Sequence, residues 1–597
     1  MAYFEIRNLT FSYNTASQAT QSGMVCEPVP ALDDVCMSIE QGEYVLVCGK
    51  SGSGKTTLLK SFKPVLMPAG VKKGNIFAGG ILIEDLDKGT QAGMVGFVMQ
   101  DPDAQIVTDK VWHELAFGLE NLGTDPKVMR ARVAEMASYF GIQDWFDRDT
   151  FRLSGGQKQL LNLASVMVMQ PRLLVLDEPT SQLDPIAAAD FLNTIRKINQ
   201  ELGTTIIISE HRLEDIYPSA DRVAVLDKGK LIAWDSPGNT AEILYEKENA
   251  MAEALPSPIR IFYGMDSMGK PEAEHSANAA LKSEECPLTV KDGRKWLEHV
   301  VKGRKICSEV TEGKLVGAKD KADIAVSIKN LWFRYDKTGA DVLKGVNLDV
   351  PKGQLTALVG GNGTGKSTLL KCICRACRPY RGKVTVKGLD ASKISRSGYL
   401  KNNVAMLPQD PKSIFAKTSV RAELEEMLGS IEAGRLERRE ETEGADNVPL
   451  DDRIKSICEI CGIQELLNRH PYDLSGGEIQ RAALGKVLMT QPEILLLDEP
   501  TKGIDGFFKK KLGRILEELK ARGVTILMVS HDVEFCAEYA DSVGMFFNGE
   551  VITVNKTEQF FSSNSFYTTA ANRMARQIWP EAVTSGEVIE MLHRSMC

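Results

Sequence analysis

Two stretches of the sequence carry the residues that a nucleoside triphosphate site needs. GKSGSGKTT at 49–57 and GGNGTGKST at 360–368 fit the pattern GxxxxGK[ST], and each follows an apolar run with strand character. The backbone N–H groups of such a loop, at the start of a helix, attract phosphate, and the lysine reaches the terminal phosphates. The next hydroxyl is placed to bind Mg²⁺. We therefore predict two sites for ATP and Mg²⁺, built on Lys55 with Thr56 and on Lys366 with Ser367.

A pair of adjacent carboxylates follows an apolar run in each half of the chain. The runs are LLVLDE at 173–178 and LLLDE at 495–499. Neighbouring side chains of a strand point to opposite faces, so the two carboxylates address different atoms. We expect Asp177 and Asp498 to hold the metal, directly or through water. Glu178 and Glu499 are then expected to polarise the attacking water.

Four further polar residues follow apolar runs and complete a hydrolytic set. Gln100 and Gln409 could bridge the metal, the water and a moving loop, and we count them among the metal ligands. His211 and His531 are expected within reach of a γ-phosphate. A lone histidine after a strand is more often structural, so these two rest on the whole set. Phosphoryl transfer depends on positioning and charge stabilisation, which such residues supply.

A pentapeptide with paired glycines precedes each carboxylate pair: LSGGQ at 153–157 and LSGGE at 474–478. A serine and two glycines at the start of a helix let a phosphate approach bare N–H groups. The spacing does not say whether each pentapeptide serves the ATP of its own half or of the other half.

The order of these motifs indicates that the chain contains one α/β unit twice. Each copy runs from strand to glycine loop to helix, and later apolar strands indicate a largely parallel, buried sheet covered by helices. The second copy is longer because of a charged insert at 433–449. We expect a first nucleotide-binding domain at 1–240, a partly helical linker at 241–322, a second nucleotide-binding domain at 323–555 and a helical tail at 556–597.

The composition restricts the partners and the environment. The 597 residues carry a net charge of −8, with no basic footprint of the kind that nucleic acids require. We expect no nucleic-acid partner. No secretory signal and no apolar stretch of about 18–20 residues is present, so a membrane span would have to come from another subunit. The 12 cysteines are expected to be reduced thiols. The cluster CICRAC at 372–377 is expected on a helix, where its thiols point apart and ligate no metal.

These motifs together resemble the ATP-binding cassette (ABC) family, and the resemblance covers nearly the whole chain outside the linker. It also includes SQLD at 181–184 and KGID at 502–505. The resemblance implies two tandem ABC nucleotide-binding domains, each with a P-loop core sheet and a helical subdomain, in a pseudo-twofold head-to-tail arrangement. It also implies that Tyr13 and Tyr335 stack on adenine. The residues that it assigns to ATP are Tyr13, Gly49, Lys50, Ser51, Gly52, Ser53, Gly54, Lys55, Thr56, Thr57, Ser154, Gly155, Gly156, Gln157, Tyr335, Gly360, Gly361, Asn362, Gly363, Thr364, Gly365, Lys366, Ser367, Thr368, Ser475, Gly476, Gly477 and Glu478.

In the ABC family, the signature of one cassette closes over the ATP on the phosphate loop of the other. The resemblance therefore implies two composite sites. One combines Lys55, Glu178 and His211 with the signature serine and glycines at 475–477. The other combines Lys366, Glu499 and His531 with those at 154–156.

Several segments are similar to the ATPase component of energy-coupling factor (ECF) transporters, with both cassettes fused. They are QDPDAQIVTDKVWHELAFGLENLG (100–123), ISEHRLED (208–215), PLTVKDGRKWLE (287–298), HPYDLSGGEIQRAALGKVLM (470–489), LLLDEPTKGID (495–505) and FFSSNSFYTTAANR near the end. The resemblance implies an ATPase at the cytoplasmic face of the cell membrane that drives uptake of a vitamin or a transition-metal ion. Its partners would be a transmembrane coupling subunit, received near 101–117 and 410–424, and a substrate-binding membrane subunit.

Two alternatives and one departure accompany this interpretation. A soluble twin-cassette ATPase acting on ribosomes or nucleic acid would be expected to carry a basic linker or a zinc module, and neither is present. A regulator without turnover would be expected to lack a carboxylate or histidine of the set.

The departure is Leu160, where the second copy has Arg481. We expect its loss to weaken a local ion pair and to put equal turnover of the two sites in question.

Overall fold

The computed structural model describes residues 3–14, 30–267, 286–302, 323–393, 404–427 and 450–596. The chain divides into two compact units, each described here by itself. The first comprises Met1–Tyr263 with Lys270–Thr289, and the second comprises Gly264–Gly269 with Val290–Cys597. The charged insert predicted at 433–449 lies outside the described residues, as do parts of the predicted linker.

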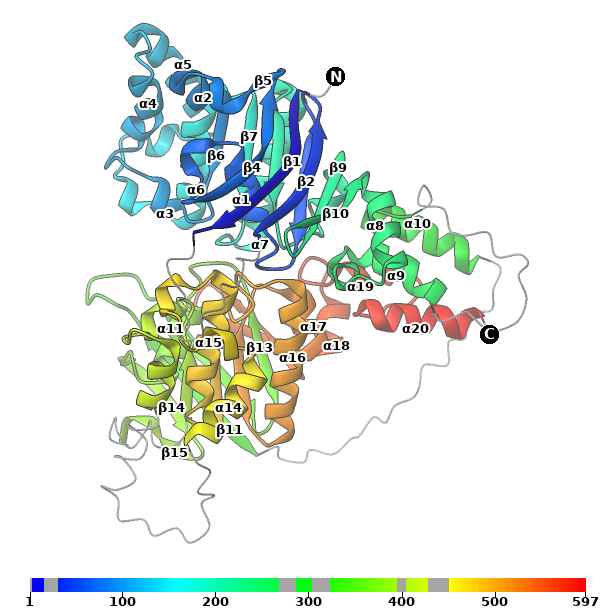
Figure 1. Ribbon diagram of the computed structural model, residues 1–597. Helices are drawn as coiled ribbons and strands as arrows, with labels where there is room; N and C mark the ends of the chain where they lie inside the picture. The colour runs from blue at the N-terminus through cyan, green and yellow to red at the C-terminus, as the bar shows by residue number, and fades with distance from the viewer. Residues whose placement is uncertain are drawn as a thin grey trace. The chain divides into compact units, whose positions relative to one another are not determined.

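The first unit begins with strands and a glycine loop and continues through alternating helices and strands (Figure 1). Its helices and strands are β1 (Phe4–Tyr13), β2 (Leu32–Ile39), β3 (Tyr44–Gly49), α1 (Lys55–Ser61), β4 (Gly70–Ala78), β5 (Ile81–Leu82), α2 (Lys88–Met94), β6 (Val95–Val98), α3 (Pro102–Gln105), α4 (Val111–Asn121), α5 (Pro126–Tyr139), α6 (Gly155–Met167), β7 (Leu173–Asp177), α7 (Pro185–Leu202), β8 (Thr205–Ser209), β9 (Arg222–Asp227), β10 (Lys230–Asp235), α8 (Pro237–Glu246) and α9 (Ser257–Ser267).

The second unit repeats this order. Its helices and strands are α10 (Val290–Val301), β11 (Ile324–Phe333), β12 (Leu343–Pro351), β13 (Leu355–Val359), α11 (Lys366–Ile373), β14 (Arg381–Val386), β15 (Leu389–Asp390), β16 (Val404–Leu407), α14 (Leu450–Cys461), α15 (Gly476–Leu488), β17 (Ile494–Asp498), α16 (Gly506–Ala521), β18 (Thr525–Val529), α17 (Val533–Tyr539), β19 (Ser542–Phe547), β20 (Glu550–Lys556), α18 (Thr557–Ser563), α19 (Ala570–Ala575) and α20 (Ser585–Met596).

Each unit contains a six-stranded sheet that carries the motifs. The order is β10-β9-β3-β8-β7-β6 in the first unit and β16-β17-β18-β13-β19-β20 in the second. The five strands from β9 to β6 run parallel, and so do the five from β16 to β19. Parallel strands covered on both faces need continuous apolar runs, and YVLVCG, LLVLD and TIIIS are buried at every position. The predicted duplicated α/β fold is therefore confirmed.

A second, antiparallel sheet of four strands accompanies each six-stranded sheet, in the orders β2-β1-β4-β5 and β12-β11-β14-β15. The alternation of buried and exposed residues along β1 and β11 reflects a sheet with one covered face. This sheet brings the ends of β1 and β11, with Tyr13 and Tyr335 beside them, next to the glycine loops.

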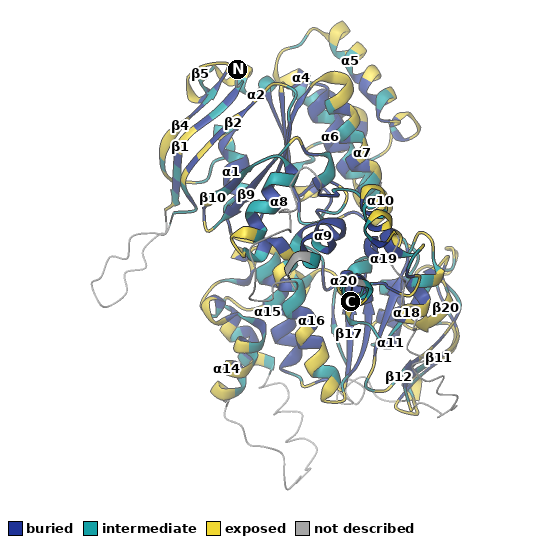
Figure 2. Cartoon of the chain, turned by 90° about the vertical axis from the view of Figure 1, so that its right-hand side faces the viewer, coloured by how far each residue is buried: buried dark blue, intermediate teal, exposed yellow. Residues whose placement is uncertain are grey.

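A helical arm lies beside the six-stranded sheet of the first unit, made of α4 and α5 (Figure 1). The exposed face of α5 is extensive, and only Val133, Met136 and Ala137 are buried on it (Figure 2). The helix α6, which begins in the signature LSGGQ, packs against α4 and so connects the arm to the signature helix.

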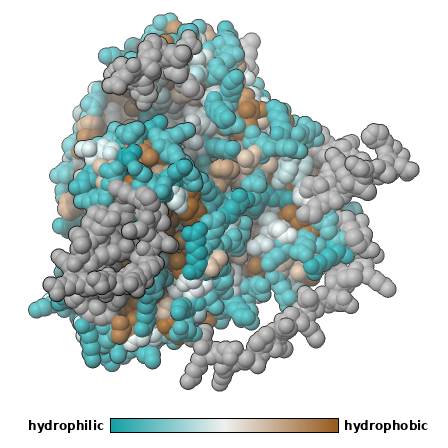
Figure 3. All heavy atoms as spheres, turned by 60° about the horizontal axis from the view of Figure 1, so that its bottom comes forward, coloured by the Kyte–Doolittle hydropathy of each residue, from teal (hydrophilic) through white to brown (hydrophobic). Residues whose placement is uncertain are grey.

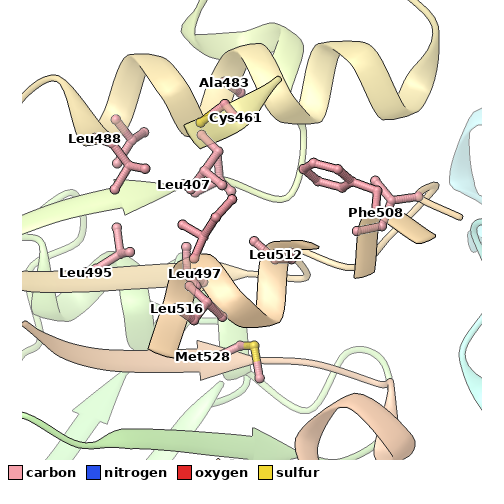
Figure 4. Close-up of a cluster of buried hydrophobic side chains, with 14 of the residues drawn as sticks. Leu407, Cys461, Ala483, Leu488, Leu495, Leu497, Phe508, Leu512, Leu516 and Met528 are labelled. Carbon is pink, nitrogen blue, oxygen red and sulfur yellow. The ribbon is translucent and has the colours of Figure 1, made fainter. Parts of the chain in front are cut away.

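The core of the second unit lies between α15, α16 and the strands β16, β17 and β18. Figure 4 shows side chains from these five elements, together with Cys461 at the end of α14, pointing toward one another. The labelled residues are Leu407, Cys461, Ala483, Leu488, Leu495, Leu497, Phe508, Leu512, Leu516 and Met528, all of them buried. Because the signature helix and the strand that ends in the carboxylates share this core, their relative position is fixed by close packing.

Helices follow the last strand of each six-stranded sheet. The segment after β10 forms α8 and α9, and the predicted boundary at residue 240 falls inside α8. The segment after β20 forms α18, α19 and α20. We call α8 and α9 the first extension, and α18 to α20 the second extension.

The surface and the helices of the described residues were compared with the expected absence of a membrane span. The face in Figure 3 is mostly hydrophilic, with apolar residues in small groups. No helix within the described ranges is both long and apolar enough to cross a membrane.

The helix predicted for the CICRAC segment is wrong in its extent, because α11 ends at Ile373, before Cys374 and Cys377. The described residues contain no cluster of three or more His, Cys, Asp or Glu that could hold a metal ion by itself.

Candidate active site

The glycine loops turn from a buried strand into a helix at positions where a side chain cannot fit. Gly49 ends β3, and a Cβ there would lie 2.3 Å from the carbonyl oxygen of Leu226. Gly360 is placed in the same way, with a Cβ position 2.1 Å from the carbonyl oxygen of Phe546. The bare backbone lets each loop bend closely over the sheet, so its N–H groups stay available for a phosphate.

The two loop lysines lie back against their own loops. Lys55 is buried, and its Nζ donates to the carbonyl oxygens of Gly49 at 2.9 Å and of Lys50 at 3.1 Å. Lys366 is also buried and donates to Gly360 at 2.8 Å and Gly361 at 2.7 Å. Both ammonium groups therefore point into the concave side of the loop, where a triphosphate would lie.

Within the described residues, two of the three predicted metal ligands meet in each unit, and the glutamines Gln100 and Gln409 are not joined to them. The hydroxyl of Thr56 lies 3.2 Å from Oδ1 of Asp177, and that of Ser367 lies 2.9 Å from Oδ1 of Asp498. Burial raises the pKa of Asp177, reinforced by the charge of Glu178 and opposed by hydrogen bonds from Ser209 and Thr56.

Burial likewise raises the pKa of Asp498, against the hydrogen bond from Ser367 and the charges of nearby lysines. One hydroxyl and one carboxylate at each site fit Mg²⁺, which takes few protein ligands and completes its shell with phosphate oxygens and water. When bound, the ion would neutralise charge on the phosphates.

The carboxylate pair is separated by a sharp change in the backbone. Asp177 ends β7, and Glu178 adopts a left-handed conformation with φ of 45°. Glu499 follows Asp498 in the same way, with φ of 54°. Non-glycine residues adopt this conformation at a cost that is common at active sites. The turn lets the aspartate and the glutamate point to different partners.

In the first unit, the glutamate is held by the predicted histidine and glutamine. Nε2 of His211 lies 2.7 Å from Oε1 of Glu178, and Nε2 of Gln100 donates to Oε2 at 2.9 Å. The backbone N–H of Glu178 also donates to the hydroxyl of Ser209 at 3.0 Å. Three of the predicted catalytic residues thus form one connected group.

In the second unit, the same group lacks one member. Nε2 of His531 lies 3.0 Å from Oε1 of Glu499 and 2.8 Å from Oδ1 of Asn362. Gln409 is exposed, and within the described part of the chain its side chain makes no hydrogen bond to Glu499. The structure therefore brings His531 and Glu499 together with the glycine loop but leaves Gln409 apart.

The two tyrosines predicted to stack on adenine both contact the helix after the glycine loop. The hydroxyl of Tyr13 lies 2.7 Å from Oγ1 of Thr57, and that of Tyr335 lies 3.1 Å from Oγ1 of Thr368. Tyr13 is 44% exposed and Tyr335 is 60% exposed. Each exposed ring lies beside the loop that would hold the phosphates of the same nucleotide.

The signature pentapeptides start helices through a reciprocal cap. Ser154 donates its backbone N–H to Gln157 and accepts the N–H of Gln157 in return, at the start of α6. Ser475 donates both its backbone N–H and its hydroxyl to Glu478, at 2.9 and 2.8 Å. These residues therefore make a preformed helix start with bare glycines, which suits phosphate binding.

Sequence reasoning missed two residues beside the predicted catalytic group. Ser209 donates its hydroxyl to Asp177 at 2.8 Å. Glu210 is buried, and it accepts the backbone N–H of Thr180 at 3.0 Å. Burial raises the pKa of Glu210 to about 7. The signal was available, because both residues directly precede His211 in the sequence.

The ion pair expected at Arg481 is wrong. Its guanidinium donates to the carbonyl oxygen of Gly462 at 2.8 Å and lies 5.5 Å from the ring centroid of Phe508. The first unit has Leu160 and Ala187 at the corresponding positions of α6 and α7. The difference between the copies is thus a carbonyl and aromatic contact, not a charge pair.

Comparisons with known proteins identify the family of the chain. The family model for the ABC transporter matches residues 32–181 and 343–502. An ABC transporter ATP-binding protein of Bacillus anthracis is 36% identical over 100% of this chain and 99% of its own length. A relative of the same description from Bacillus thuringiensis subsp. konkukian is 37% identical over 99% of this chain and 98% of its own length. One from Methanosarcina acetivorans is 31% identical over 99% of this chain and 91% of its own length.

Among solved structures, cbiO1 from Clostridium perfringens, part of the ABC transporter complex cbiONQ, is 26% identical. The match covers 43% of the present chain and 96% of cbiO1, with a TM-score of 0.36. The family match and the full-length relatives decide the assignment: the chain belongs to the ABC transporter family, as an ATPase with two ATP-binding cassettes.

Proposed function

We propose that this chain is the ATP-hydrolysing, energising subunit of a membrane importer of the ECF type, taking up a vitamin or a transition-metal ion. The observation that carries the proposal is the hydrolytic set present in both cassettes, where a glutamate meets a histidine at 2.7 Å in one and 3.0 Å in the other. The segments similar to ECF ATPases support the finer assignment. The site of action would be the cytoplasmic face of the membrane.

In this proposal, the side chains divide the work of hydrolysis. Glu178 and Glu499 accept a proton from the attacking water, because each follows the aspartate that meets the hydroxyl of the glycine loop and each is held by a histidine. Each histidine holds the glutamate in place through Nε2 and reaches the γ-phosphate. The lysines of the loops stabilise charge on the phosphates as it develops.

We further propose that each ATP lies between the phosphate loop of one cassette and the signature of the other. Moving a 1:99 open-to-closed ratio to 99:1 needs about 5.5 kcal/mol of preference for the closed state. ATP contacts from two cassettes can supply that preference, and ADP lacks the γ-phosphate that completes them. Hydrolysis then reopens the pair and moves the membrane partner.

A surface on the first cassette supports a membrane partner. Val107 is 68% exposed and Trp112 is 42% exposed, and both follow Gln100 in the segment predicted to receive a coupling subunit. Such exposed apolar side chains, one before α4 and one in its first turn, lie in the segment that follows Gln100, which bonds to Glu178, and fit a contact that reports on the nucleotide site. The proposed partners are a transmembrane coupling subunit and a substrate-binding membrane subunit.

The proposal is tested by purifying the tagged chain from detergent-solubilised membranes and identifying what remains bound. Integral membrane proteins in a fixed ratio to the chain are the expected result. A Val107→Arg, Trp112→Ala double variant should lose them, whereas Val65→Arg, at a valine elsewhere on the cassette that is 78% exposed, should keep them. Capture of ribosomes or nucleic acid in place of membrane proteins would overturn the importer assignment.

The composite arrangement has its own test. Ser154→Arg places a bulky cation in the signature of the first cassette and should disable the site that contains Lys366. Ser475→Arg is the matched variant and should disable the site that contains Lys55. Nucleotide trapped by vanadate is mapped to one cassette or the other by photocrosslinking and mass spectrometry. Loss at the site in the same cassette would refute the pairing.

A further inference from the structure

A glutamate stands three residues after each catalytic histidine, and its role is not accounted for by hydrolysis. Glu214 follows His211, and Glu534 follows His531. Each side chain is partly buried and bonds to the extension of its own cassette. The same bond recurs in both cassettes although the surrounding sequences differ.

In the first cassette, Glu214 holds the start of α9. Its two carboxylate oxygens accept the backbone N–H of Ser257 at 3.0 and 3.1 Å. Ser257 is the first residue of α9 and is fully buried. Arg260, one turn further on, donates to the hydroxyl of Ser257 at 3.2 Å. Burial raises the pKa of Glu214, and the charge of Arg260 and the hydrogen bonds from Ser257 oppose the rise.

In the second cassette, Glu534 holds the start of α19. Its Oε1 accepts the backbone N–H of Ala570 at 2.7 Å. Ala570 is the first residue of α19 and has no exposed surface. The side chain of Asn572 is buried as well, and it donates to the carbonyl oxygens of Pro580 and Ala582, both at 2.9 Å. The glutamate therefore binds a rigid part of the second extension.

Each bond connects the loop that bears the histidine with an ordered helix outside the sheet. The loop runs on from β8 or β18, and the glutamate follows the histidine by three residues, in the loop itself for Glu214 and in the first turn of α17 for Glu534. A hydrogen bond from a buried N–H to a charged acceptor is stronger than a hydrogen bond between neutral groups. A shift of about 1 Å at a catalytic group can cost about 100-fold in rate. Fixing the loop at the glutamate thus restricts where the histidine can lie.

We propose that Glu214 and Glu534 are positioning residues, which set the contact between histidine and catalytic glutamate by fixing each histidine loop to the first or second extension. The inference rests on the proposed roles of His211 and His531. It adds a route by which a change in an extension alters hydrolysis in its own cassette. Neither glutamate touches ATP or the reacting atoms.

The test compares two substitutions at each glutamate in the full-length protein. Glu214→Ala removes the acceptor, and Glu214→Gln keeps an acceptor oxygen without the charge. We expect the alanine variant to lower kcat about 10- to 100-fold with an unchanged KM for ATP, since misplacement of a catalytic group by about 1 Å has effects of this order. The glutamine variant should recover most of the rate. The same pattern is expected for Glu534.

Matched controls use exposed acidic residues of the same segments. Asp215→Asn lies next to Glu214, and Glu538→Gln lies on α17 with Glu534, and both side chains are exposed. Both controls should hydrolyse ATP at the rate of the unaltered protein. If an alanine variant fails to fold, Ala570→Pro serves instead, because proline removes the donor N–H at a helix position that tolerates it. Ala570→Pro should lower kcat as Glu534→Ala would.

A double-mutant cycle separates positioning from a purely structural role. If Glu214 acts through His211, then adding Glu214→Ala to His211→Ala should cause no further loss of kcat. Equal losses in both backgrounds, or an alanine variant with normal kcat, would overturn the inference. Full turnover in His211→Ala and His531→Ala would instead remove the proposed role of the histidines, a result that is distinguishable from failure of the inference alone.

Discussion

The two cassettes contain the same glutamate and histidine pair, but different neighbouring residues hold that pair in place. In the first, Gln100 donates to Glu178, so the base has a second partner. In the second, Asn362 of the glycine loop lies 2.8 Å from Nε2 of His531, and Oε2 of Glu499 accepts the backbone N–H of His531 at 3.2 Å. In the proposed mechanism the pair itself serves hydrolysis, whereas the neighbours that orient it differ between the copies.

The strand that ends in the histidine loop shows the same divergence. Ser209 and Glu210 in the first cassette correspond to Val529 and Ser530 in the second. Ser209 donates to Asp177, a bond that Val529 cannot make. We therefore expect two competent sites that respond differently when their neighbours are changed.

The largest expected effect removes the feature that the cassettes share. Glu178→Gln combined with Glu499→Gln should retain ATP binding and lose hydrolysis about 10²- to 10⁴-fold, the usual contribution of a positioned base. Phosphate release and nucleotide binding are measured on the same preparation. Near-normal turnover would contradict the assignment of both glutamates.

A smaller effect should separate the two glutamines. Gln100→Ala removes a hydrogen bond to Glu178, whereas Gln409→Ala removes none to Glu499 within the described structure. A hydrogen bond to a charged group contributes about 1.5–3 kcal/mol, so Gln100→Ala should lower kcat about tenfold or more and Gln409→Ala much less. Equal effects in steady-state kinetics would show that the asymmetry disappears once nucleotide binds.

The signature helices differ by one packed pair of residues. Arg481→Leu should destabilise the second cassette by about 1–2 kcal/mol, because a hydrogen bond to Gly462 and a contact with Phe508 are lost. Leu160→Arg in the first cassette should change stability by less than about 0.5 kcal/mol, since Ala187 offers no ring. Urea unfolding, with hydrogen exchange of α6 and α15 followed separately, measures both. A stabilised first cassette would refute the comparison.

The last prediction is a pH dependence at Glu210 of the first cassette, where the second cassette has Ser530. Burial raises the pKa of Glu210 from 4.5 in the unfolded chain to about 7. The protonated form is favoured in the fold, so the contribution of Glu210 to stability is present below about pH 4.5 and is lost as the pH rises through about 7. Glu210→Gln should therefore flatten the loss of unfolding free energy across this range. A parallel pH profile for the variant and the unaltered protein would contradict this expectation.

The duplicated fold and the core of each site could be predicted from sequence because they depend on local patterns. A glycine loop between an apolar strand and a helix places Lys55 and Lys366 wherever it occurs. The carboxylate pairs follow buried strands of a parallel sheet, so their position at the sheet edge follows from the pattern alone. Those residues lie where they were expected.

The partners that tune each site could not be predicted, because they come from elements distant in the sequence. The contact of Asn362 with His531 joins residues 169 positions apart. The expected ion pair of Arg481 was wrong because the nearest acceptor is a backbone carbonyl, which no side-chain pattern reveals. The end of α11 at Ile373 was missed as well, since Arg375 adopts a left-handed conformation with φ of 61° that its residue type does not indicate.

The exchange of Arg481 and Phe508 for Leu160 and Ala187 has a consequence for inheritance. Both cassettes lie in one polypeptide, so a substitution in the first copy occurs once per molecule. In a dimer of two identical cassettes, the same substitution would occur twice. A substitution that would harm a symmetric pair of identical cassettes is thereby tolerated in one of them. The fused chain can accumulate differences between its halves while each half keeps the glutamate and histidine pair proposed for hydrolysis.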